Sequence, residues 1–181
     1  NKLIMIIVSL ASAMAVTAIP LLSAAHTQGD YRSISKQIAN TLDLFIFVMI
    51  PAAFGMAGIA VPIYTVFYSY DPLGSSVLYL SAFTAISLGL FTVLMAILQG
   101  LSENILAIKY LILGLIIKII LQYPMILMFK IYGPLISTNI GMLIIIFLAI
   151  KHLEISFNFN IGRTGRRFTG ITVFSILMFA V

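Results

Sequence analysis

Lys118 is the side chain whose chemistry most needs explaining, because it is the one charge in a mostly apolar run over residues 110–129. A lysine at the centre of a bilayer costs about 2.5–3.5 kcal/mol on insertion scales, so it should face protein or water rather than lipid. Gly114 and Gln122 lie four residues before and after it, which places all three on one face of a helix. We therefore predict a cavity-facing cation that meets an anionic group of a substrate. The alternative is a structural lysine bonded to carbonyls or to a carboxylate.

Four more polar side chains are candidates for the same cavity. Gln122 shares the helix face of Lys118. Gln99 and Asn139 lie inside or near long apolar runs, where hydrogen bonding between helices is the alternative role. Asp43 is close to the expected start of a helix, where a carboxylate stabilises the N-terminus. Capping is the first expectation for Asp43, and a cavity role follows if that helix starts later or tilts.

Patterns typical of catalysis or metal binding are not found in the sequence. There is no cysteine, and His26 and His152 are not spaced as metal ligands. The segment GRTGRR at 162–167 lacks the spacing of a phosphate-binding loop. We interpret its arginines as a basic loop that faces anionic lipid headgroups; they are Arg163, Arg166 and Arg167. We expect no enzyme, no cofactor, no metal and no nucleic-acid partner.

The composition indicates an integral membrane protein. Of the 181 residues, 62% are hydrophobic and 8% are charged, whereas a soluble domain carries about 25% charged residues. Backbone groups in lipid must be satisfied internally, and the continuous apolar runs do not alternate as the strands of a membrane barrel do. The predicted fold class is all-α, a polytopic bundle of transmembrane helices.

About six transmembrane helices are expected, the last of them truncated. They are placed at residues 3–25, 42–68, 77–101, 106–129, 133–151 and 168–181. The run at 168–181 is shorter than the roughly 20 residues that span a bilayer, and the chain opens on Asn1. Both ends are therefore predicted to be cuts in a longer protein. Pro51, Pro62 and Pro124 lie within these helices and are predicted to bend them.

Lysine and arginine are concentrated on one side of the predicted bundle. Loops at 26–41, 102–105 and 152–167 are expected to be cytoplasmic, because most positive charge lies in them or next to them. The residues on that side are Arg32, Lys36, Lys109, Lys151, Arg163, Arg166 and Arg167, and those on the other side are Lys2 and Lys130. The first helix then runs from outside to inside.

The loop at 26–41 has a helical pattern of its own. From Asp30 onward, Ile34 and Ile38 fall on one face of a helix, and the basic residues fall elsewhere. This arrangement is typical of an amphipathic helix at a membrane surface.

Several short motifs, in their order and spacing, resemble one family of membrane transporters. Residues 18–69 hold a helix ending in IPLLS, a GD segment with two basic residues, and the motifs IPAAFG and VPIYTVFY. Residues 97–126 hold QG at a helix end and the helix with Lys118, and IYGPLISTNIG follows at 131–141. Together they resemble the second lobe of the multidrug/oligosaccharidyl-lipid/polysaccharide superfamily. Within that superfamily, they resemble the stage V sporulation protein B-like branch and the lipid II flippases of Gram-positive bacteria.

The resemblance implies a two-lobe transporter of which this chain is the C-terminal lobe, with the missing N-terminal lobe as its partner. It implies alternating access in the bacterial cell membrane, which moves a polyprenyl-pyrophosphate-linked sugar outward. The substrate would be a peptidoglycan precursor or a polysaccharide unit, and membrane lipids are further expected partners. A pyrophosphate favours cations in a water-filled cleft, so Lys118 is a candidate contact.

Two other functions are considered. A cation-coupled exporter of drugs or small molecules with the same fold would need a carboxylate deep in the bundle, for which Asp43 is the only candidate. A non-transporting scaffold for cell-wall assembly would depend on its cytoplasmic loops, and Lys118 would be dispensable.

Overall fold

The computed structural model describes residues 2–68 and 72–157, and every element in this part of the chain is helical. The elements are α1 (Lys2–Thr27), α2 (Tyr31–Gly58), α3 (Ala60–Tyr68), α4 (Pro72–Gly100), α5 (Asn104–Phe129), a 3-10 turn η1 (Lys130–Tyr132) and α6 (Gly133–Phe157). The all-α fold class is confirmed. The helix expected at 168–181 lies outside the described residues.

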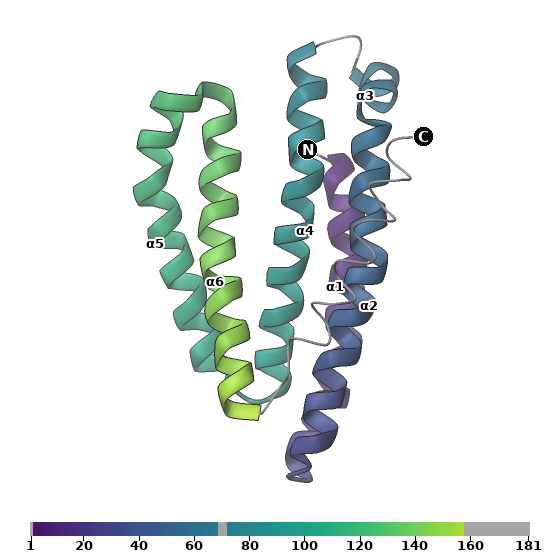
Figure 1. Ribbon diagram of the computed structural model, residues 1–181, viewed down its shortest axis with the longest axis vertical. Coiled ribbons are helices and arrows are strands. Elements are labelled where there is room, and N and C mark those ends of the chain that lie inside the picture. Colours follow the sequence, from purple (N-terminus) through teal and green to yellow (C-terminus); the bar gives the residue numbers. More distant parts are fainter. Residues whose placement is uncertain (1, 69–71, 158–181) are drawn as a thin grey trace.

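Four helical stretches of the described residues are long and apolar enough to cross a membrane. They are Met5–Thr27, Tyr31–Gly58, Ser76–Gly100 and Asn104–Phe157. The last stretch has 54 residues and contains both α5 and α6. A single helix of that length would measure about 80 Å, far more than a hydrocarbon core of about 30 Å. The chain instead turns at η1, and α5 and α6 pack side by side as a hairpin (Figure 1).

The central helix of the bundle is α4. Helices α1 and α2 pack against it and against each other, α6 packs against its other side, and α5 lies mainly against α6 (Figure 1). Helices α1, α2 and α4 meet at Gly89, where an added Cβ would lie 2.7 Å from Met49 Cε and 3.0 Å from Ala11 Cβ. Ser81 and Ala85, on the same face of α4, are also buried. These small residues let the neighbouring helices approach closely.

The prediction of a loop at residues 26–41 is wrong over most of that range, because α2 already begins at Tyr31. Asp30 is the N-cap of this helix. Its Oδ1 accepts hydrogen bonds from the backbone N–H groups of Arg32 at 3.1 Å and Ser33 at 3.0 Å. These bonds satisfy two of the donors that the first turn of a helix leaves free.

The helical pattern in this segment is confirmed, but the expected helix at the membrane surface is wrong, because the segment is the first part of the spanning helix. Ile34 and Ile38 are buried in the bundle, and the helix continues through them without a break into the membrane-spanning part. The helix expected at 42–68 therefore starts too late. Asp43 lies well inside α2, so the expected capping role for this residue is wrong.

Helices α2 and α3 are separated at Ile59, inside the single helix expected at 42–68. Pro62 lies four residues after the last residue of α2. A proline lacks the N–H that would bond the carbonyl four residues earlier, and its ring clashes with that carbonyl. This accounts for the interruption. Pro51 and Pro124 lie inside the continuous helices α2 and α5, and bending at these two positions stays a prediction.

Helix α6 extends beyond its expected end at residue 151. It runs to Phe157, so the beginning of the loop expected at 152–167 is helical. Leu153 and Phe157 are buried and continue the inner face of α6. The Phe157 ring lies 6.3 Å from the ring of Tyr31, which joins the end of α6 to the start of α2. Three residues of the expected basic loop lie outside the described residues: Arg163, Arg166 and Arg167.

Candidate functional site

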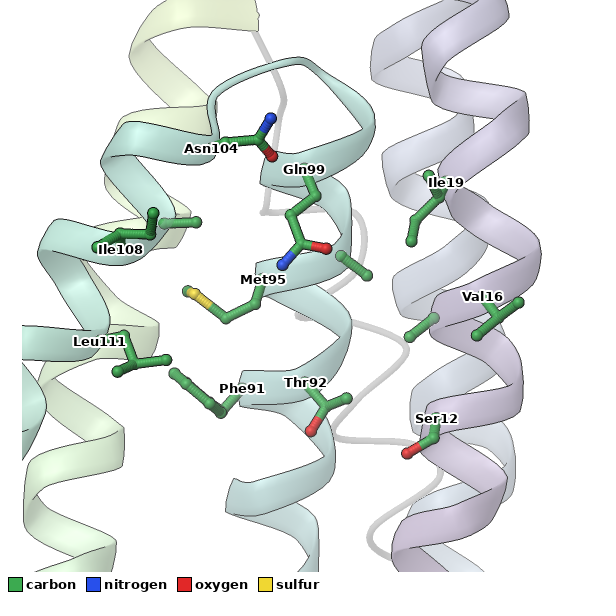
Figure 2. Close-up of a pocket in the computed structure, with 13 residues that line it drawn as sticks. Ser12, Val16, Ile19, Phe91, Thr92, Met95, Gln99, Asn104, Ile108 and Leu111 are labelled. Carbon is green, nitrogen blue, oxygen red and sulfur yellow. The ribbon is translucent and has the colours of Figure 1, made fainter.

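A cavity of about 590 Å³ lies between α1, α4 and α5 (Figure 2). We name it the amide cavity, because Gln99 of α4 and Asn104 of α5 line it beside the turn that joins these helices. The hydroxyl groups of Ser12 and Thr92 also line it. Each hydroxyl donates to a carbonyl one turn earlier in its own helix, at 3.1 Å and 2.9 Å respectively. Their oxygen lone pairs remain available as acceptors. The rest of the lining is apolar.

A second cavity of about 170 Å³ lies between α4, α5 and α6. We name it the lysine cavity, because Lys118 lines it, and Thr138 of α6 lines it as well. Phe91 and Leu111 line both cavities. The two cavities are therefore neighbours along α4 and α5, with this apolar pair at their junction.

The backbone around Lys118 is set by close packing of α5 on α6. An added Cβ at Gly141 would lie 3.6 Å from Lys118 Cβ and 3.3 Å from the carbonyl oxygen of Gly114. The lysine stem therefore passes over a glycine, and its side chain is half-buried. Among residues 2–68 and 72–157, the Lys118 ammonium has no hydrogen-bond or ion-pair partner. The structural alternative for Lys118 needs an acceptor, and the described residues supply none.

Asn139 and Gln122 do not line either of these cavities. The Asn139 amide donates to Thr84 Oγ1 at 2.8 Å and to the Leu135 carbonyl at 3.0 Å. It thus joins α6 to α4, which is the alternative that the sequence left open for Asn139. Gln122 is half-buried on α5, one turn beyond Lys118.

Asp43 lies on a different side of the bundle from the lysine cavity. It is half-buried on α2, and α2 packs chiefly against α4 and α1 rather than α5. Within the described part of the chain, no ion pair joins Asp43 to Lys118. Of the five polar residues proposed for one cavity, Gln99 and Lys118 line the two adjoining cavities.

A hydrogen-bonding contact that sequence reasoning missed joins the turn before α5 to α6. His152 Nε2 lies 2.5 Å from Glu103 Oε2, and Ser156 Oγ lies 3.4 Å from the same ring nitrogen. Both partners are about a quarter exposed. Since they are 49 positions apart, no local spacing could signal the pair. No cluster of three or more His, Cys, Asp or Glu residues in the described ranges is arranged to hold a metal ion.

Phe91, Leu111 and Asn104 are further cavity residues that were not predicted. Phe91 and Leu111 are apolar residues within apolar runs, so their types carry no signal in the sequence. Asn104 follows the turn after Gln99, and this close spacing of two amides across a turn is the one signal that could have placed it.

The fold and the cavities define a class of protein. The chain is a multi-pass, all-α membrane protein whose bundle holds an ammonium group inside a spanning helix, beside a cavity. Ionisable residues at such positions mark substrate and ion pathways.

Comparison with known proteins adds one relative. The chain is 35% identical over 172 residues to the lipid II flippase MurJ of Bacillus subtilis strain 168. The match covers 91% of this chain and 32% of that relative, so the chain spans 32% of the length of the flippase. This similarity confirms the resemblance to the lipid II flippases. No family model matches the chain, and no solved structure matches it.

Proposed function

We propose that the chain is part of a flippase that moves a polyprenyl-pyrophosphate-linked sugar, a peptidoglycan precursor, outward across the bacterial cell membrane. It acts as a transporter, not as an enzyme, and it works by alternating access together with a second lobe of the same protein. The similarity to a lipid II flippase supports this substrate class.

The observation that carries the proposal is that Lys118, in a spanning helix beside a cavity, has no partner for its ammonium group among residues 2–68 and 72–157. An uncompensated charge at this depth is costly, and contact with water or an anion removes much of the cost. A pyrophosphate supplies such an anion. Charge-assisted hydrogen bonds to it would be stronger than neutral ones.

The amide cavity suits the neutral part of the same substrate. Gln99 and Asn104 each offer one acceptor oxygen and two N–H donors, which match the hydroxyl and amide groups of a sugar. Figure 2 shows the Gln99 side chain extending along α4 toward the level of Met95. We assign the sugar to the amide cavity and the pyrophosphate to Lys118.

The two alternative functions receive less support. A cation-coupled exporter would place a carboxylate at the transport cavity, and Asp43 lies on α2, away from the helix hairpin that carries Lys118. A scaffold without transport gives no reason for an ammonium group at this depth in a spanning helix.

Substitution of Lys118 in the full-length parent protein tests the proposal. Lys118→Gln and Lys118→Met should lower outward movement of labelled lipid-linked sugar by about tenfold or more, because one charge-assisted hydrogen bond is worth roughly 1.5–3 kcal/mol. Transport is measured in cells together with the amount of protein in the membrane.

Lys109→Gln is the matched control, since Lys109 is an exposed lysine on the same helix. It should leave transport near the parental rate. Normal transport by both Lys118 variants would overturn the proposed role of this residue.

A further inference from the structure

We propose that Phe91 and Leu111 form an apolar barrier between the two cavities, and that the anionic headgroup reaches Lys118 from the cytoplasmic side by displacing it. This inference rests on the proposed function, and it adds the route by which the substrate enters. The amide cavity is the cytoplasmic compartment of this route, and the lysine cavity lies deeper in the membrane.

The lining of the two cavities places the barrier. Phe91 and Leu111 are the two side chains that both linings share. They come from facing helices, and Figure 2 shows them extending toward each other from α4 and α5. A direct path between the two cavities inside the bundle therefore passes this phenyl ring and this isobutyl group.

Positions along the helices give the order of the compartments. On α4, Gln99 lies eight residues beyond Phe91, which corresponds to about 12 Å along the axis. On α5, Lys118 lies seven residues beyond Leu111, or about 10.5 Å. The amides therefore lie about two turns on one side of the barrier, and the cation about two turns on the other.

The charge pattern assigns the amide end to the cytoplasm. Gln99 and Asn104 flank the α4–α5 turn, and Lys109 and Lys151 lie at the same end of the α5–α6 hairpin. Arginine and lysine are enriched on the cytoplasmic side of membrane proteins. A lipid-linked precursor made in the cytoplasm would thus meet the amides first.

Both side chains of the pair are apolar. Apolar side chains facing each other across a narrow passage exclude water, and with it ions and charged headgroups. Leu111 is 48% exposed and Phe91 is half-buried, so neither is locked in a close-packed core. Rotation of these two side chains would open the passage without breaking a hydrogen bond between them.

Cysteine accessibility tests this barrier directly. The 181 residues contain no cysteine, so Lys118→Cys places one thiol in this part of the full-length parent, with any cysteine elsewhere replaced by serine. Inside-out membrane vesicles are treated with a membrane-impermeant, negatively charged methanethiosulfonate, and the labelling rate is measured. Adding Phe91→Ala should raise that rate by about tenfold or more, because the constriction becomes wet. Leu111→Ala should act in the same way from the opposite helix.

Val16→Ala is the matched control, because Val16 is an exposed residue that lines the amide cavity away from the barrier. It should leave the labelling rate unchanged. Phe91→Leu keeps an apolar side chain and should keep labelling slow. If Phe91→Ala lowers the amount of protein in the membrane, the Leu111→Ala variant decides the result.

Equal labelling rates with and without the barrier side chains would overturn the inference, and so would fast labelling of Lys118→Cys from the outer face alone. Labelling does not depend on transport. Normal transport by Lys118→Gln would therefore refute the substrate role of the lysine and leave the barrier to be judged by its own measurement.

Discussion

At the scale of single residues, the environment of Lys118 separates its stem from its charge. Gly141 has no side chain to displace the lysine stem, which lies over it. The methylene groups can therefore pack on α6 and line the lysine cavity, while the ammonium group at their end lies outside its apolar lining. Long basic side chains commonly divide in this way between apolar packing and a polar tip.

Gly114 of α5 lies at the same contact between α5 and α6, and we expect Gly114→Ala to be destabilising. An added Cβ at Gly114 would overlap Ile145 Cδ1. Overpacking of this kind costs about 1–3 kcal/mol. Thermal unfolding of the purified full-length protein in detergent measures the loss.

Ile145→Val removes the overlapping methyl group and provides the control. Alone it should cost about 0.5–1.5 kcal/mol, but in the Gly114→Ala background it should restore part of the lost stability. Additive losses in the double variant would show that α5 and α6 do not meet at these two residues.

The candidate site could be predicted only where residue type conflicts with surroundings. Lys118 and Gln99 are polar residues in apolar runs, and the structure places both on cavities. Phe91 and Leu111 match their surroundings, so only the packing of α4 on α5 identifies them. Asn139 had the same sequence signal as Gln99, but its amide bonds Thr84 within the bundle. A polar residue in a span therefore indicates either a cavity or a contact between helices.

At the scale of elements, capping decides where the helices begin. Hydropathy marks the part of a helix that lies in lipid, whereas α2 extends beyond it into the region of Arg32 and Lys36. The Asp30 cap stabilises this polar first turn. Its contribution is independent of the bilayer.

Asp30→Ala should loosen the start of α2. Loss of an aspartate N-cap costs about 0.5–2 kcal/mol. The loss should first affect the two backbone amides that donate hydrogen bonds to Asp30. Hydrogen exchange of the Arg32 and Ser33 amides should therefore become faster, by roughly 2- to 30-fold on the same energy scale. Asp30→Asn retains an acceptor oxygen and should change the exchange much less. Unchanged exchange in Asp30→Ala would mean that water satisfies this turn equally well.

The existence of the helices was easier to predict than their ends. Long uncharged runs correctly indicated the described spans, because apolar length is what a bilayer selects. The predicted start of α2 lies too late in the sequence and the predicted end of α6 too early. The charged residues beyond these two boundaries had been assigned to loops. Ile34 and Leu153 are buried beyond those boundaries, so the packed face of a helix continues outside the apolar run.

At the scale of the whole molecule, α4 divides the bundle into two unequal parts. Helices α1 and α2 form a packed core with α4, whereas the α5–α6 hairpin is joined to α4 mainly through α6 (Figure 1). The amide cavity lies between these parts. A small change in the angle of the hairpin would therefore widen or close this cavity without disturbing the core around Gly89.

Two outer faces of the bundle have no partner within the described residues. On α5, Ile119, Ile120 and Tyr123 are exposed. On α1, the small residues Ser9 and Ala13 are also exposed, together with Thr17. In a bilayer such faces meet lipid or other helices. The chain spans only 32% of the length of its relative, so the parent protein can supply such helices.

The measurement closest to the central claim is binding of charged and neutral lipids to the purified full-length parent. Its affinity for a polyprenyl-pyrophosphate-linked sugar is compared with that for a matched neutral lipid-linked sugar, in the parent and in Lys118→Gln. We predict that the parent prefers the pyrophosphate and that Lys118→Gln reduces this preference by about tenfold, with binding of the neutral lipid unchanged. An equal preference in both proteins would contradict the assignment of Lys118 to the anionic headgroup.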